Sequence, residues 1–208
     1  MIIASINQPA FGDSIWLDFS KNSDTDFKVY KKEDIVVIED SNDKLIGLNL
    51  LNWSNKLNIN KNSGFIPISS DEIELISQKL PEFKDFLISE LKRPYFVVGV
   101  IKEIKEHPKL QKLKIIKVEI GQKELLQLVS GSINLKVGLK TVVAQTGAIM
   151  PNGSKILASK IGGIESPGAL CNRADLNLSS PEIKGAIEID DSSIQPGSDY
   201  ASVENIIY

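Results

Sequence analysis

The alternation of apolar and polar residues divides the chain near residue 94. In the first part, short apolar segments are separated by clusters of Asn, Asp, Ser and Gly, which is typical of β-strands joined by tight turns. Because Asn and Asp tolerate left-handed backbone, residues 41–43 are predicted to form a hairpin turn, and the Asn- and Lys-rich residues 53–64 a loop. The predicted strands are Ser14–Phe19, Phe27–Lys31, Ile35–Glu39 and Ile46–Leu51.

The pattern changes to helical spacing after residue 68. Ser69 or Ser70 can cap a helix that begins at Asp71, where acidic residues follow and the helix dipole favours negative charge. Pro81 is predicted to begin a second helix, since a proline at the first helical position loses no useful N–H group. We therefore expect residues 1–94 to form a small α+β domain. The apolar stripe of the two helices consists of Ile73, Ile76, Leu80, Phe83, Phe86, Leu87 and Leu91.

From Phe96 onwards the apolar residues recur with a period of two, first in residues 96–100 and again in residues 116–120. Glycines separate the short segments that follow, as expected for the corners of a small closed barrel. Further strands are predicted at Leu125–Ser130, Thr141–Gln145, Lys155–Ser159, Gly168–Asn172 and Gly185–Ile189. The fold class is thus predicted as mainly β: an α+β domain over residues 1–94, followed by an OB-fold β-barrel over residues 95–208.

The composition is that of a water-soluble globular protein. Of the 208 residues, 42% are hydrophobic and 25% are charged, and no apolar run approaches the length of a membrane span. The first residues carry no cation before their apolar positions, so we expect no secretory signal. Cys171 is the single cysteine, which excludes an internal disulfide and a thiolate zinc cluster. We expect a cytoplasmic protein with no membrane partner, metal or other cofactor.

Charge is distributed unevenly along the chain. Residues 95–173 contain 12 Lys and Arg against 5 Asp and Glu, whereas residues 174–208 contain 1 against 7 and residues 1–94 contain 11 against 15. A basic segment between two acidic ones favours a polyanion-binding surface that the net charge of −3 conceals.

The residue types needed for catalysis are scarce. His107 is the single histidine and precedes Pro108, which favours a turn residue over a general base or a metal ligand. Cys171 lies in an apolar segment and is predicted to be a small buried hydrophobe, and Asp190-Asp191 to be solvated. No glycine-rich phosphate loop is present. We therefore expect the protein not to be an enzyme.

Binding by the basic segment is the remaining interpretation. No Phe, Trp or Tyr occurs between Val97 and Asp199, so base stacking of a single strand is poorly supported. Recognition of a folded RNA through its shape, phosphates and 2′-hydroxyls is favoured instead. The basic side chains concerned are Lys102, Lys105, Lys109, Lys112 and Lys114, and then Lys155, Lys160 and Arg173.

Four ordered motifs in residues 96–199 carry a family resemblance. They are VVGVIKEIKEHP (97–108), LVSGSINLKVG (128–138), VVAQTGAIMPNG (142–153) and KIGGIESPGALC (160–171). Together they resemble the tRNA-binding domain of the EMAP II/Trbp111 type, which also occurs at the N-terminus of bacterial phenylalanyl-tRNA synthetase β subunits. Residues 1–94 add a weaker resemblance to YtpR-type proteins, whose N-terminal domain has no assigned role. The resemblance implies an OB-fold domain that binds tRNA.

The resemblance also implies particular site residues. The lysine of the family's HPxADKL loop falls on Lys112 and the serine of its SxGM pattern on Ser166. The chain departs from the family where Leu110-Gln111 replaces Ala-Asp, where Gly162 replaces an arginine and where Ala169 replaces a methionine. Lysines would neutralise phosphates while Ser166, Asn134 and backbone amides fix the register on the tRNA. The expected tRNA-binding residues are Lys109, Lys112, Lys114, Asn134, Lys155, Lys160, Ser166 and Arg173.

Other interpretations stay open at this point. The barrel is alternatively a protein-interaction module that docks an aminoacyl-tRNA synthetase or another translation partner. An enzymatic activity in residues 1–94 is poorly supported, because that part contains no His and no Cys for general-base or thiol chemistry. The apolar residues Val203 and 206–208 are expected either to cover the barrel or to join a homodimer interface.

Overall fold

A computed structural model describes residues 2–22 and 26–202 of the chain. The contacts divide it into two compact units, residues 1–93 and residues 94–208, and each is described by itself. The residues expected at a homodimer interface, Val203 and 206–208, lie outside the described part.

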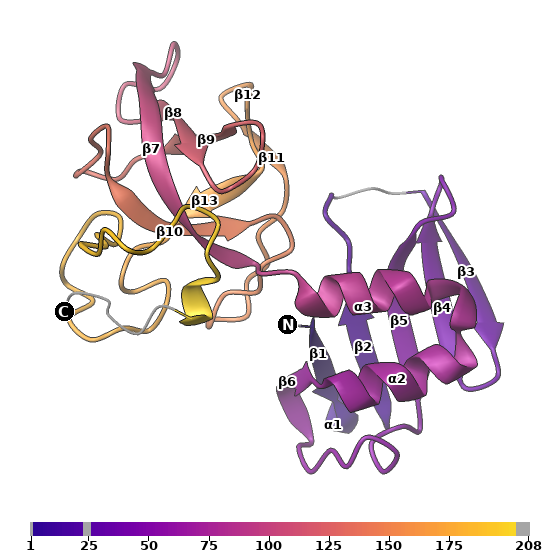
Figure 1. Cartoon of the computed structure of the whole chain (residues 1–208). Coiled ribbons are helices and arrows are strands. Elements are labelled where there is room, and N and C mark those ends of the chain that lie inside the picture. Colours follow the sequence, from indigo (N-terminus) through magenta and orange to yellow (C-terminus); the bar gives the residue numbers. More distant parts are fainter. Residues whose placement is uncertain (1, 23–25, 203–208) are drawn as a thin grey trace. The chain divides into compact units, whose positions relative to one another are not determined.

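A six-stranded antiparallel sheet forms the body of the first unit (Figure 1). Its strand order is β3-β4-β5-β2-β1-β6, so β3 and β6 are the two edges. A short helix, α1 (Gln8–Phe11), connects β1 to β2. The strands are β1 (Ile2–Asn7), β2 (Ser14–Asp18), β3 (Phe27–Lys32), β4 (Ile35–Asp40), β5 (Leu45–Leu51) and β6 (Ser63–Ile68).

Two strands of this sheet were not predicted. β1 is a short segment whose buried residues alternate with partly buried ones, and its sequence was not singled out as a strand. β6 begins inside the predicted loop 53–64 and contains both Gly64 and Pro67, residues that weaken the pattern of a strand. Proline is tolerated there because β6 pairs with β1 alone and is an edge strand. The predicted loop therefore ends at residue 62.

The helices cover one face of the sheet (Figure 1). α2 (Ser70–Lys79) is capped by Ser69, whose side chain accepts from the N–H of Glu72 while the Glu72 carboxylate accepts from the N–H of Ser69. Pro81 begins a 3-10 turn, η1 (Pro81–Phe83), and the second α-helix, α3 (Lys84–Lys92), follows it. The core of the unit contains, among others, Leu17, Val37, Leu48, Ile73, Ile76 and Leu87, each at most 2% exposed.

A nearly closed five-stranded barrel forms the second unit, and the chain as a whole is mainly β, as predicted. The order is β13-β10-β7-β8-β9, and the two end strands β9 and β13 contact each other, which nearly closes the barrel. A separate hairpin of β11 and β12 contacts β9, and a 3-10 turn, η2 (Tyr200–Ser202), ends the described chain. The strands are β7 (Phe96–Glu106), β8 (Lys114–Glu119), β9 (Leu126–Ser130), β10 (Lys140–Gln145), β11 (Ser159–Ile161), β12 (Ile164–Ser166) and β13 (Gly168–Leu170).

The predictions of strands at 155–159 and 185–189 were wrong. Lys155 forms one isolated bridge with Ile149, and β11 begins only at Ser159. In residues 185–189 the backbone N–H groups find different acceptors, so no continuous ladder forms. Ala186 donates to the side chain of Asn134, Ile187 to the carbonyl of Cys171, and Ile189 to the carbonyl of Lys140.

The barrel interior is packed closely enough to require glycine at one position. A Cβ atom at Gly99 of β7 would lie 2.7 Å from methyl carbons of Val118 and Val143.

Cys171 is fully buried, as predicted, and burial raises the pKa of its thiol to about 12. The single thiol is therefore a packing residue at physiological pH.

Candidate nucleic-acid interface

His107 joins two segments that lie about fifty residues apart in the sequence. Its Nδ1 atom accepts hydrogen bonds of 3.1 Å from the backbone N–H groups of Lys109 and Leu110, and its Nε2 atom lies 3.0 Å from the carbonyl oxygen of Ile161. Because Nδ1 accepts, Nε2 carries the proton and donates to Ile161. The side chain is 5% exposed. It therefore fixes the β7–β8 connection, residues 107–113, against the β11–β12 hairpin, residues 159–166.

The turn of the hairpin approaches the β7–β8 connection closely. Gly162 has φ +58°, and a Cβ atom there would lie 2.5 Å from Cε1 of His107. A Cβ atom at Gly163 would lie 3.8 Å from Nζ of Lys109. On the other side of the connection, a Cβ atom at Gly131 would lie 3.0 Å from a methyl carbon of Leu113. We call residues 107–113 and 159–166 together the loop surface.

The base of the hairpin is held to β9 by two side chains. Ser166 is 1% exposed, and its Oγ accepts from the N–H of Val129 at 3.1 Å and lies 3.2 Å from the carbonyl oxygen of Gly168. The side-chain amide of Gln127 donates to the carbonyl oxygen of Glu165 at 3.1 Å. The expected site residue Ser166 is thus a buried member of the loop surface, where it positions the hairpin.

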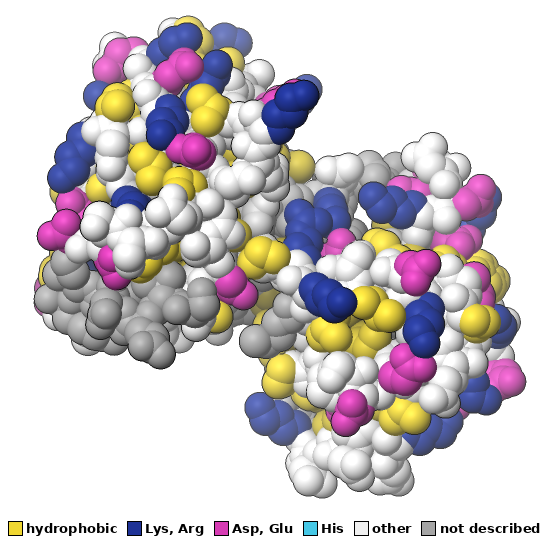
Figure 2. Space-filling view, viewed as in Figure 1, with side chains coloured by type: hydrophobic (Ala, Val, Ile, Leu, Met, Phe, Trp, Pro, Cys, Tyr) yellow, Lys and Arg dark blue, Asp and Glu magenta, His cyan; other side chains and the backbone are white. Residues whose placement is uncertain are grey.

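At least six of the twelve lysines in residues 94–202 have an acidic partner. Two lysines of the loop surface, Lys109 and Lys112, are exposed and have no acidic partner within 4.0 Å among the described residues. Pairs within 4.0 Å include Lys102–Glu119, Lys105–Glu103, Lys117–Glu103, Lys114–Glu106, Lys136–Glu188 and Lys160–Glu165. Figure 2 shows Lys and Arg side chains gathering at the top of this unit, where Figure 1 places the β7–β8 connection. The uncompensated positive charge of the loop surface therefore comes from Lys109 and Lys112.

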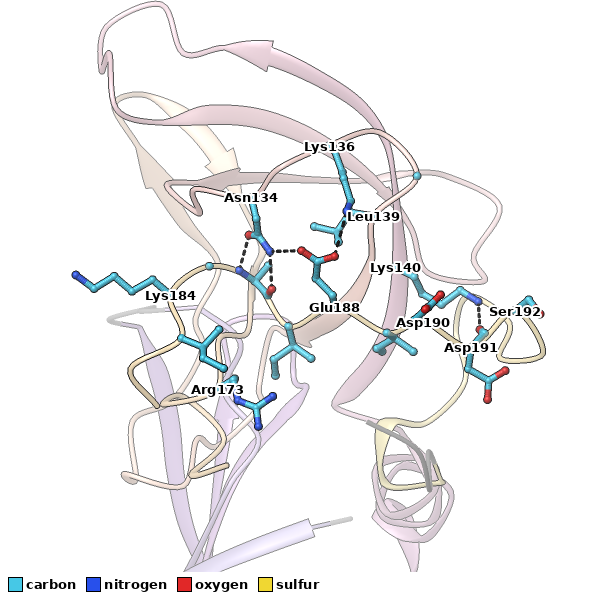
Figure 3. Close-up of a pocket in the computed structure, with 16 residues that line it drawn as sticks. Asn134, Lys136, Leu139, Lys140, Arg173, Lys184, Glu188, Asp190, Asp191 and Ser192 are labelled. Carbon is cyan, nitrogen blue, oxygen red and sulfur yellow. Dashed lines mark hydrogen bonds and ion pairs between the residues drawn. The ribbon is translucent and has the colours of Figure 1, made fainter. Parts of the chain in front are cut away.

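Asn134 belongs to a different part of the barrel, a groove of about 770 Å³ between the β9–β10 connection and residues 183–192 (Figure 3). Its side chain bridges the two segments: the amide donates to the carbonyl of Ala186 and to Glu188, and its oxygen accepts from the N–H of Ala186. Lys136 also pairs with Glu188 at 3.1 Å. Hydrogen bonds from Asn134 and Lys136 lower the pKa of the Glu188 carboxyl.

Arg173 lines the same groove, but its guanidinium forms hydrogen bonds within the chain. It is 6% exposed; its Nε donates to the carbonyl oxygen of Ser179 at 2.7 Å, and Nη2 lies 3.2 Å from the Ser179 hydroxyl oxygen.

Lys155 is half-buried, in the bridge with Ile149. The structure thus brings Lys109, Lys112, Lys160 and Ser166 together in the loop surface, with Lys114 at its base. It places Asn134, Lys155 and Arg173 elsewhere.

Three residues that organise the loop surface were not predicted to do so. His107 was interpreted as a turn residue, and Gln127 and Gly131 were not singled out. A histidine at the start of a lysine-rich turn was a usable signal, because a neutral imidazole can accept from the turn's own N–H groups. Nothing in the sequence indicates that its other nitrogen reaches a hairpin fifty residues away.

Over residues 2–22 and 26–202, no group of three or more His, Cys, Asp or Glu side chains is arranged to hold a metal ion. None of the helices described is long and apolar enough to span a bilayer.

Residues 96–199, half of the chain, match the sequence family described as "Putative tRNA binding domain". The chain belongs to this family. It is also 31% identical over 191 residues to "Putative tRNA-binding protein YtpR" of Bacillus subtilis (strain 168), a match that covers 90% of this chain and 94% of the relative. The loop surface, the groove and every expected site residue lie inside the tRNA-binding domain.

Two further relatives are phenylalanine–tRNA ligase β subunits. That of Wolbachia sp. subsp. Brugia malayi (strain TRS) is 39% identical over 124 residues, and that of Aromatoleum aromaticum (strain DSM 19018 / LMG 30748 / EbN1) is 44% identical over 97 residues. These matches cover 57% and 47% of this chain but only 15% and 12% of the ligase subunits. The likeness to the ligases is therefore at the level of the tRNA-binding domain.

Proposed function

We propose that the protein binds tRNA through the loop surface and catalyses no reaction there. The observation that carries the proposal is the pair Lys109 and Lys112, which are exposed, lack an acidic partner among the described residues and stand on a connection fixed by His107. A fixed connection holds the backbone that carries both lysines in place before the RNA arrives, which reduces the entropy lost on binding. A cytoplasmic location follows from this partner.

The chemistry of the surface favours recognition of shape. Lysine binds phosphate as a point charge and reads no base sequence, and the loop surface contains no Phe, Trp or Tyr for stacking. Contacts to phosphates and 2′-hydroxyls of a folded RNA remain. We therefore expect many tRNAs to bind with similar affinity.

The eight expected site residues take two roles in this proposal. Lys109, Lys112, Lys114, Lys155 and Lys160 supply positive charge, with Lys114 and Lys160 weakened by their partners Glu106 and Glu165. Ser166, Asn134 and Arg173 act by positioning backbone segments, since their polar atoms are bonded within the chain.

A charge-matched pair of double variants tests the proposal. Lys109→Gln with Lys112→Gln removes two charges from the loop surface. Lys123→Gln with Lys184→Gln removes two exposed charges that also lack an acidic partner among the described residues but lie outside the loop surface. We expect the first double variant to reduce the slope of log K against log salt by about 2 for bulk tRNA, and the second to leave it unchanged.

Anisotropy titrations of the full chain across a salt series, with duplex DNA and single-stranded RNA as competitors, supply the measurement. If both double variants weaken binding equally, the interaction is diffuse and the loop surface is not the site. If tRNA competes no better than duplex DNA, recognition of tRNA shape is wrong.

Three exposed apolar side chains favour a second candidate function, the docking of a synthetase or another translation partner. Ile133 and Val137 are 79% and 64% exposed in the connection between β9 and β10, and Ile183, which lines the groove, is 53% exposed. Large apolar side chains that are exposed close together are typical of protein contacts. Retention of a protein partner after nuclease treatment, lost on Ile133→Ser with Val137→Ser, would select this function.

A further inference from the structure

The edge strand β3 exposes both of its faces. The side chains of all six residues, 27–32, are exposed, and these include Phe27 at 56%, Val29 at 55% and Tyr30 at 40%. β3 pairs with β4 on one side, and Figure 1 shows its other side at the border of the sheet. A strand of this kind is a template for pairing with another strand.

Lysine on an edge strand normally opposes such pairing, and β3 carries Lys28, Lys31 and Lys32. Whether these lysines prevent pairing with a second copy of β3 depends on the register. A two-fold axis that sets β3 antiparallel to its own copy runs perpendicular to the sheet. Each residue then faces one on the same side of the sheet, so the two residue numbers of every facing pair differ by an even number.

One symmetric register centred within residues 28–32 avoids facing lysines. With Val29 opposite Val29 of the second copy, Lys28 faces Tyr30, Phe27 faces Lys31 and Asp26 faces Lys32. Centring the axis on Lys28, Lys31 or Lys32 sets that lysine opposite itself, and centring it on Tyr30 sets Lys28 opposite Lys32. The register at Val29 instead gives two lysine–aromatic pairs and one pair of opposite charges, all of which are favourable.

The same register continues an apolar row across the boundary. Within the sheet, Val29 faces Ile38 of β4. With Val29 at the axis, the row becomes Ile38, Val29, Val29 and Ile38 across the two copies. This row lies on the face of the sheet opposite the core residues Val37 of β4 and Leu48 of β5. Burying these half-exposed side chains supplies a hydrophobic contribution to association.

We propose that two copies of the chain associate by antiparallel pairing of β3 with β3, centred on Val29, so that the two six-stranded sheets become one continuous sheet. The proposal is independent of tRNA binding by the barrel.

Variants of the full chain that each add one cysteine test the register directly. Facing residues in an antiparallel pair have Cα atoms about 4.5–5.5 Å apart, which permits a disulfide. Val29→Cys should therefore form a disulfide-linked dimer under mild oxidation. Lys31→Cys lies on the same face, but its two copies would be roughly 13 Å apart along the strand, beyond the reach of a disulfide. The buried thiol of Cys171 is common to all variants.

A mixing experiment provides a second readout. Phe27→Cys and Lys31→Cys should each cross-link poorly alone and roughly tenfold faster when mixed, because residue 27 of one copy faces residue 31 of the other. The wild-type chain should sediment as a dimer at high micromolar concentration, and Val29→Lys as a monomer with an unchanged circular-dichroism spectrum. A monomeric wild type, or a dimer in which Lys31→Cys cross-links as fast as Val29→Cys, overturns the proposal.

Discussion

Nε2 of His107 donates a hydrogen bond of 3.0 Å to the carbonyl oxygen of Ile161, while Nδ1 accepts from the N–H groups of Lys109 and Leu110. One imidazole thereby satisfies three backbone groups on two segments. Replacing it leaves those groups with no partner in a site that is 95% shielded, because His107 is 5% exposed. Both segments of the loop surface depend on this side chain.

His107→Phe keeps an aromatic ring of similar size but removes all three hydrogen bonds. We expect the free energy of unfolding to fall by about 1–3 kcal/mol and the affinity for tRNA to fall with it. Urea denaturation at neutral pH gives the first quantity and anisotropy with bulk tRNA the second. A stability within experimental error of the wild type would show that the imidazole bonds are dispensable.

Gly162→Ala and Gly163→Ala separate steric contact from backbone strain. Both positions have positive φ, +58° and +89°, so each alanine should cost roughly 1–2 kcal/mol of stability. At Gly162 the new Cβ would also lie 2.5 Å from Cε1 of His107, whereas at Gly163 the nearest atom is 3.8 Å away. We therefore expect a clearly lower melting temperature for Gly162→Ala than for Gly163→Ala. Equal melting temperatures would mean that the hairpin turn is not packed on His107.

The thiol of Cys171 should be inert in the folded chain. Burial raises its pKa to about 12, so the reactive thiolate is scarce at pH 8, and the sulfur is shielded from reagents. Reaction with an aromatic disulfide reagent is expected to follow unfolding, while the exposed thiol of Lys123→Cys reacts at once as the internal control. Rapid labelling of the native wild type would contradict the burial.

Glu188 should contribute to stability only above acidic pH. Hydrogen bonds from Asn134 and Lys136 lower its folded pKa below the ordinary 4.5. A lowered carboxyl pKa gives stability that is fully present above 4.5 and is lost as the pH falls through the folded value. The difference in unfolding free energy between the wild type and Glu188→Gln should therefore shrink on acidification.

Glu182→Gln provides the matched control for Glu188, since Glu182 is exposed and has no ion pair among the described residues. Its stability should follow the wild type at every pH. If both variants show the same pH dependence, the contacts of Glu188 with Asn134 and Lys136 do not operate in solution.

The elements with strong local signals were predictable from the sequence. Ser69 and Glu72 mark the start of α2, and the alternation at 96–100 and 116–120 marks the barrel strands. β6 was missed because its Gly64 and Pro67 are acceptable only at the edge of a sheet, which is a property of the assembled fold. Residues 185–189 alternate like a strand, but their N–H groups go to acceptors on separate segments.

The candidate site was predictable in its chemistry but not in its assembly. The excess of lysine indicated a polyanion surface, but ion pairing leaves Lys109 and Lys112 as its uncompensated part, and cross-strand partners such as Glu119 are visible only in three dimensions. Asn134 and Arg173 were predicted to face the RNA, whereas hydrogen bonds to Ala186 and Ser179 hold them within the chain. These residues remain testable as positioning groups.

The distance in sequence between His107 and Ile161 has a consequence for the ribosome-bound nascent chain. The β7–β8 connection is synthesised long before the hairpin that completes the loop surface, so a chain truncated after β10 possesses both lysines but not the site. Affinity for tRNA is acquired at a late step of folding. By mass action, tRNA at a hundredfold excess over its dissociation constant would then stabilise the finished chain by about 2.7 kcal/mol, which makes the RNA a selective ligand of correctly folded molecules.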